Sequence, residues 1–143
     1  MVRTAVSQML RACLLSIGLS LLATSAWAGD VETCRDNQAE ATARLTACNA
    51  VIADDKVTGK PKAFAHWFVG DGLMRKQRNY DAALAAFDKA LELDPDNAVT
   101  LNSRGLAYFN KGDEDRAMAD YGLALQKRPN YAAPINNRGL IYL

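Results

Sequence analysis

Histidine is nearly absent from this sequence: His66 is the only one among 143 residues. Acid–base catalysis and zinc binding both rely on histidine, and both need partner groups held within reach of it. No Cys, Asp or Glu recurs at a suitable spacing around His66, so we interpret it as a packing or surface residue. The sequence therefore predicts no enzyme activity, no catalytic residue, no metal site and no cofactor.

An excess of charge of either sign is also missing. The 17 Lys and Arg residues nearly balance the 16 Asp and Glu residues, which leaves a formal net charge of +1. Nucleic-acid binding requires a concentrated basic face that releases counterions, and no stretch of the sequence supplies one. We expect no nucleic-acid partner.

Long apolar runs are absent except near the start of the chain. Arg3 and Arg11 precede an apolar run over residues 12–22, which is shorter than the roughly 20 residues that a membrane-spanning helix needs. The small residues Ala26 and Ala28 follow, at the two positions that a signal peptidase inspects. This pattern predicts a secretory signal over residues 1–28 with cleavage after Ala28, and an uncleaved anchor is the weaker alternative. The mature chain would be periplasmic or secreted, with no membrane insertion.

Cysteine is scarce, and none of the three cysteines forms the C-x-x-C pair of redox sites or the C-x-x-C-H motif of c-type haem proteins. Signal cleavage would remove Cys13 and leave Cys34 and Cys48, for which a disulfide is the default in an oxidising compartment. Within one continuous helix these two would be roughly 21 Å apart, far beyond the reach of a disulfide. The helical segment over residues 31–53 must therefore turn back near residues 36–38.

What the sequence does contain is a repeat. Several residue types recur 34 positions later, in the pairs Asp81/Asp115, Ala83/Ala117, Phe87/Tyr121, Ala90/Ala124, Leu91/Leu125 and Pro95/Pro129. The recurrence continues in Asn102/Asn136, Arg104/Arg138, Gly105/Gly139, Leu106/Leu140 and Tyr108/Tyr142. Apolar residues within the repeat follow the i, i+3, i+4, i+7 spacing of a helix with one buried face.

The period and the residue types resemble the tetratricopeptide repeat, a unit of two antiparallel helices. The second copy matches the family pattern at Gly105, Tyr108, Ala117, Tyr121 and Pro129. The first copy keeps its aromatic, alanine and proline positions, and its first helix fits better with a shift of one residue. The resemblance implies an all-α fold, a short right-handed stack of antiparallel helix pairs.

This organisation divides the chain into five segments. They are the signal peptide (1–28), an N-terminal helical cap or half-repeat with the disulfide (29–63), repeat 1 (64–97), repeat 2 (98–131) and the first helix of an incomplete repeat 3 (132–143). In the cap, Ala43, Ala47 and Ala50 echo the buried alanine and aromatic positions of repeat 1. Residues 54–62 are expected to form a loop, and Asn97 and Asn130 are expected to cap the helices that follow them.

Packing between the helices is predicted at two places. Gly105 should face Ala117 closely, with Tyr121 filling the space beside them, because two helices approach most closely where a side chain is nearly absent. Arg138 is expected to reach Asp120 on the preceding second helix and so to bridge neighbouring repeats.

The resemblance also implies a function. In the family, the first helices line a concave groove that binds peptides of partner proteins. Carried onto this sequence, the groove residues are Phe68, Asn102, Leu106, Phe109, Asn110, Asn136 and Leu140. The amides of Asn102 and Asn136 can both donate to and accept from a peptide backbone. The expected function is binding of another protein or peptide, and the alternative is a structural element that self-associates through 132–143 or belongs to a longer repeat array.

Overall fold

The computed structural model describes residues 28–143, and within this range it contains helices and no strands. The predicted signal peptide lies outside the described residues except for Ala28. Residues 28–35 are helical, and the later helices are α2 (Ala41–Ala53), α3 (Gly59–Gln77), α4 (Tyr80–Leu93), α5 (Ala98–Asn110), α6 (Glu114–Lys127) and α7 (Ala132–Ile141). The predicted all-α class is confirmed.

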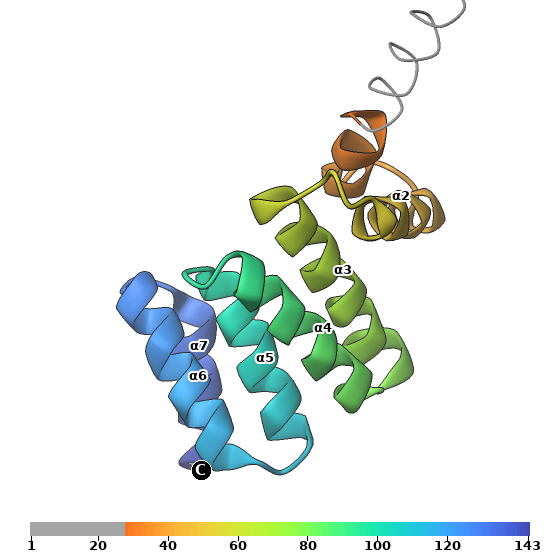
Figure 1. Ribbon diagram of the computed structural model, residues 1–143. Helices are drawn as coiled ribbons and strands as arrows, with labels where there is room; N and C mark the ends of the chain where they lie inside the picture. The colour runs from red at the N-terminus through yellow and green to blue at the C-terminus, as the bar shows by residue number, and fades with distance from the viewer. Residues whose placement is uncertain (1–27) are drawn as a thin grey trace, which may run out of the picture.

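Consecutive helices pack against one another from α2 to α7 and form a short solenoid of antiparallel pairs (Figure 1). The first helices of successive repeats also meet, because α3 contacts α5 and α5 contacts α7. The backbones of the second helices α4 and α6 do not approach each other as closely. The stack is therefore tighter on the side of α3, α5 and α7, which we call the inner face.

Helix boundaries follow from local side-chain chemistry. Asn79, Asn97 and Asp113 each accept a hydrogen bond from a backbone N–H of the first turn of the next helix, and so satisfy donors that the helix leaves unpaired. The predicted cap at Asn97 is confirmed. The predicted cap at Asn130 is wrong, since α7 begins after Tyr131 without a side-chain cap.

Two glycines set the distance between the helices of each repeat. A Cβ on Gly105 would lie 2.7 Å from the Tyr121 ring and 3.2 Å from the Ala117 carbonyl oxygen, which confirms the predicted close approach. In repeat 1, a Cβ on Gly70 would lie 2.8 Å from the Phe87 ring. Gly70 and Gly105 are 35 residues apart, whereas Phe87 and Tyr121 are 34 apart. The expected shift of one residue in α3 is therefore present.

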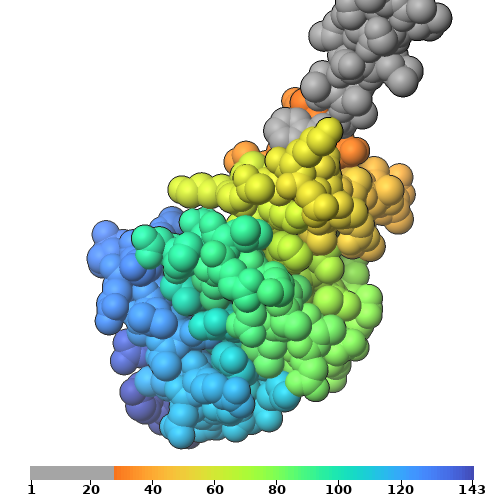
Figure 2. Space-filling view, viewed as in Figure 1, coloured from red at the N-terminus to blue at the C-terminus, as the bar shows by residue number. Residues whose placement is uncertain are grey.

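The helix over residues 28–35 and α2, which we call the N-terminal unit, cover one end of the repeat stack (Figure 2). Cys34 and Cys48 form the predicted disulfide, with Cα atoms 4.8 Å apart, and the chain turns back over residues 37–39. The two cysteines lie in an apolar cluster with Ala47, Val51 and residues of α3. A second cluster, centred on Phe87, fills the space between α3, α4 and α5.

Two expectations for this unit are wrong. The buried face of α2 is Ala47, Cys48 and Val51, while Ala43 and Ala50 are exposed. The face that is buried instead carries Cys48 of the disulfide and packs against α3. The loop is also shorter than 54–62, because α3 begins at Gly59 and Pro61 lies in its first turn, where a missing N–H costs nothing.

Candidate functional site

The inner face is held together by hydrogen bonds between first helices. Trp67 Nε1 donates to Ser103 Oγ at 3.0 Å, and this bond joins α3 to α5. Asn137 Nδ2 donates to Asn102 Oδ1 at 3.1 Å, which joins α7 to α5. With the shift of one residue in α3, Trp67 occupies the position of Asn102, and Asn137 follows Ser103 by 34 residues. The two hydrogen bonds therefore join equivalent positions of successive first helices.

This arrangement changes the role of Asn102. The residue is 9% exposed, and its side-chain oxygen already accepts a hydrogen bond from Asn137. Asn102 therefore joins two first helices, and only part of the hydrogen-bonding capacity of its amide remains for a peptide. Asn136, the other amide predicted to bind a peptide, is exposed on α7.

Of the other predicted groove residues, three are partly buried and two are exposed. Phe68 packs into the N-terminal cluster, where the guanidinium of Arg44 lies 4.3 Å from its ring centre. Leu106 and Phe109 are partly buried in α5. Asn110 is exposed, although its amide also donates to the Leu106 carbonyl of its own helix at 2.8 Å. Leu140 is exposed on α7.

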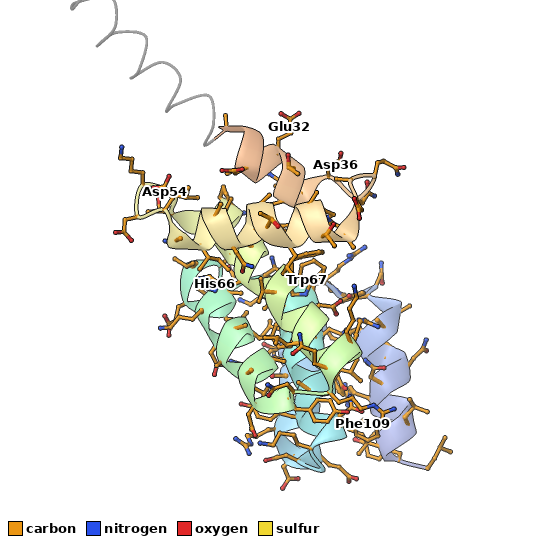
Figure 3. All side chains as sticks on the ribbon, turned by 90° about the vertical axis from the view of Figure 1, so that its right-hand side faces the viewer. Glu32, Asp36, Asp54, His66, Trp67 and Phe109 are labelled. Carbon is orange, nitrogen blue, oxygen red and sulfur yellow. A yellow bond between two sulfur atoms is a disulfide. The ribbon has the colours of Figure 1, made fainter. Side chains whose placement is uncertain are left out.

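Trp67 is the inner-face residue that the sequence argument missed. The unshifted repeat register places Phe68, and not Trp67, at the groove position of α3. Figure 3 shows Trp67 and Phe109 on the same side of the helices, with His66 on the other side. The sequence signal for the shift that places Trp67 here is the distance from glycine to aromatic residue. This distance is 17 residues from Gly70 to Phe87 and 16 from Gly105 to Tyr121.

An arginine connects the two repeats. Arg104 on α5 donates from Nε and Nη2 to both carboxylate oxygens of Asp120 on α6, at 2.8 and 2.7 Å, and from Nη1 to Asp88 on α4 at 2.8 Å. The hydrogen bond with Asp120 is the largest cause that raises the pKa of Arg104 above its ordinary value, and burial opposes it. The predicted pair of Arg138 with Asp120 is wrong, because Arg104 holds that carboxylate.

A hollow of about 260 Å³ lies between α2 and α3. Apolar side chains provide most of its wall, with Arg44 and Lys76 among the charged residues at it. Its lining residues are Ala41, Arg44, Leu45, Phe68, Val69, Asp71, Gly72, Leu73, Lys76 and Gln77.

His66 has no carboxylate hydrogen bond among the described residues. Burial lowers its pKa below the ordinary value, and the nearby charges of Lys62 and Lys89 lower it further. No group of three or more His, Cys, Asp or Glu side chains that could hold a metal ion occurs within residues 28–143. In the same part of the chain, no helix combines the length and apolar character required to cross a bilayer.

The paired helices and the repeated inner-face contacts define a helical-repeat protein. Family comparison then names the repeat: a profile described as TPR repeat matches residues 73–112, and one described as tetratricopeptide repeat matches residues 98–131. Together the two matches cover residues 73–131 and support a protein of the tetratricopeptide repeat family. No curated protein matches it significantly. Repeats of this family generally mediate protein–protein interaction and are typically scaffolds without catalytic activity.

Proposed function

We propose that this chain is an exported, non-catalytic module that binds an extended or helical segment of another protein along its inner face. One observation carries the proposal: α3, α5 and α7 lie side by side and still leave polar and apolar side chains accessible on the same surface. A partner lying across these helices would contact both repeats at once.

The accessible side chains suggest how a peptide would be held. Asn110 and Asn136 carry amides that can donate to and accept from a peptide backbone without reading its sequence. Val99 and Leu140 are exposed apolar residues, and Phe109 is partly exposed. The best-fitting partner is a segment with apolar side chains and a free backbone, and Asn102 contributes indirectly by holding α7 in place.

Site-specific photo-crosslinking tests this proposal. A benzophenone amino acid at position 136 should crosslink a partner, and the same group at Ala119, an exposed position of α6, should not. The double variant Asn110→Arg, Asn136→Arg places two charges on the inner face and should abolish capture. The matched control Ala85→Arg, Ala119→Arg adds the same charges at exposed positions of α4 and α6 and should leave capture intact. Equal capture by both double variants would rule out the inner face as the binding surface.

Export is the second part of the proposal. Two features support it: the signal-like pattern of residues 1–28, and a disulfide buried in the N-terminal unit, which persists in oxidising compartments. Mass spectrometry of the protein from its native cell should find a mature chain beginning at Gly29. Purification of an intact chain from the reducing cytosol would contradict this.

A further inference from the structure

The hollow between α2 and α3 arises because α2 crosses α3 at a steep angle, as Figure 1 and Figure 3 show. The apolar cluster that the two helices share extends along α3 as far as Val69, and beyond it α2 diverges from α3. In repeat 2, by contrast, α4 lies along α5, where Asp88 pairs with Arg104 and Asp81 pairs with Lys111. The hollow is therefore a consequence of the crossing between two neighbouring helices.

Apolar side chains and an open glycine form the wall of the hollow. Leu45 of α2 lines it together with Val69 and Leu73 of α3. A Cβ on Gly72 would meet nothing within 4 Å, so the backbone of α3 is accessible there. An apolar cavity of about 150 Å³ admits benzene, so the hollow of about 260 Å³ has room for one compact apolar group and a small polar group.

Two contacts hold the guanidinium of Arg44 at this hollow. It lies 4.3 Å from the ring centre of Phe68, and its Nε donates to the carbonyl oxygen of Cys34 at 3.4 Å. Neither contact uses the N–H groups of Nη1 and Nη2, which can donate to a carboxylate. No Asp or Glu among residues 28–143 forms an ion pair with Arg44.

Lys76 adds a second positive charge at the hollow. With the shift of one residue in α3, Lys76 corresponds to Lys111, which pairs with Asp81 of α4. Lys76 itself has no such partner in the described part of the chain. Asp71 also lines the hollow, but its carboxylate already pairs with Arg75 at 2.6 Å. Two cations without a carboxylate therefore lie beside an apolar wall.

We propose that this hollow binds a small monocarboxylic acid that carries one compact apolar group, such as a phenyl ring. The carboxylate accepts hydrogen bonds from Arg44 and pairs with Lys76, while the apolar group rests over Gly72. A protein side chain is the poorer occupant, because none combines a carboxylate with an apolar group of this size. The inference goes beyond the proposed binding of a peptide along the inner face and does not depend on it.

Hydrocinnamate provides the probe, and hydrocinnamamide is its uncharged counterpart. In a heteronuclear NMR titration of the disulfide-bonded full chain, the acid should bind with a dissociation constant of about 0.1 to 1 mM, as expected for so few atoms. The amide resonances that shift should be those of residues 41–45 and 68–77. Gly72→Leu fills the hollow without a clash and should weaken binding about tenfold or more. Gly139→Leu, at another open glycine of a first helix, is the matched control and should leave binding unchanged.

A second pair of variants tests the role of charge. The parent chain should bind the acid about tenfold more tightly than the uncharged amide, because only the acid can pair with the two cations. Arg44→Met with Lys76→Met should remove this preference. Arg116→Met with Lys127→Met removes the same number of charges from α6 and should preserve it. Arg116 is a close match for Arg44, since each guanidinium lies over an aromatic ring.

Three results would overturn the proposal: no saturable binding of the acid, equal binding of acid and amide by the parent chain, or binding unaffected by Gly72→Leu. Asn110→Arg with Asn136→Arg separates this site from the inner face, because it should abolish partner capture and leave binding of the acid unchanged. A benzophenone amino acid at position 45 gives one further outcome. Capture of a protein at this position, by a chain that does not bind the acid, would identify a protein as the occupant and would also overturn the proposal.

Discussion

At the scale of single residues, the same amino acid has opposite surroundings in successive repeats. Gly105 and Gly139 are 34 positions apart, and each is the eighth residue of a first helix. The Tyr121 ring and the Ala117 carbonyl leave no room for a Cβ at Gly105, whereas Gly139 is open. Glycine is costly inside a helix, so its presence is explained by packing at one position and not at the other.

This contrast predicts opposite effects of one substitution. Gly105→Ala should lower the free energy of unfolding by about 1 to 2 kcal/mol, because overpacking outweighs the gain in helix propensity. Gly139→Ala should raise it by about 0.5 kcal/mol, since only the propensity gain applies. Urea denaturation followed by circular dichroism measures both. A stabilising Gly105→Ala would show that the Tyr121 ring moves aside freely.

Tyr121 raises a second question at this scale, because its hydroxyl is buried without a hydrogen-bond partner among the described residues. Burial, followed by the charge of Asp120, raises its pKa to about 12. A tyrosine in the unfolded chain ionises near pH 10, so the unfolded state binds fewer protons than the folded state between about pH 10 and 12. Ionisation of Tyr121 therefore does not affect the free energy of unfolding below about pH 10, and it lowers this free energy as the pH rises from about 10 through the folded pKa.

Tyr121→Phe should accordingly have two effects. At pH 7 it should raise the free energy of unfolding by up to about 1 kcal/mol, because it removes an unsatisfied buried hydroxyl. Between pH 10 and 12 it should flatten the decline in stability. Tyr142→Phe is the control, since Tyr142 is exposed and its hydroxyl should have no such influence. Identical alkaline profiles for Tyr121→Phe and the parent chain would contradict the buried-hydroxyl argument.

At the scale of helices, Arg104 connects three of them through two carboxylates of very different exposure. Asp120 is buried on α6, whereas the side chain of Asp88 on α4 is about half exposed. An ion pair with one exposed member is worth little, but a buried carboxylate that loses its partner is costly. The bond to Asp120 should therefore matter more than the bond to Asp88.

Arg104→Ala is expected to lower the free energy of unfolding by about 2 to 4 kcal/mol, because Asp120 would remain buried and unpaired. Asp88→Asn should cost less than about 1 kcal/mol. The double variant Arg104→Leu, Asp120→Leu should recover much of the loss, since apolar residues replace the buried pair. Chemical denaturation of the three variants provides the comparison, and equal costs for Arg104→Ala and Asp88→Asn would contradict the argument.

The helices of the repeats could be predicted from the sequence because each has an internal template. The 34-residue period and the apolar spacing predict helix pairs in residues 64–131, and α4, α5 and α6 lie in this range. The sequence did not predict those features that depend on how helices outside one repeat pack against each other. Nothing in the repeat indicated that Asn102 would bond to Asn137, because the two lie on helices whose relative rotation depends on tertiary packing. The buried face of α2 likewise depends on the disulfide and on the contact with α3. Neither contact follows from the 34-residue repeat.

At the scale of the whole molecule, the described residues form two apolar clusters that both include parts of α3. One contains the disulfide and the N-terminal helices, and the other joins the two repeats around Phe87. Repeat proteins derive their stability from each unit and its contact with neighbours, so the two clusters need not unfold together.

Removal of the disulfide should separate them. Cys34→Ala with Cys48→Ala should destabilise the N-terminal unit by about 3 kcal/mol in the chain-entropy account, because the unfolded segment regains freedom. Hydrogen exchange should then accelerate in residues 41–53 and stay unchanged in α5 and α6, which share no residue with the disulfide-containing cluster. Addition of a reductant to the parent chain should reproduce this pattern. Equal acceleration from α2 to α6 would instead mean that α3 transmits the loss along the stack and that the whole described chain unfolds as one cooperative unit.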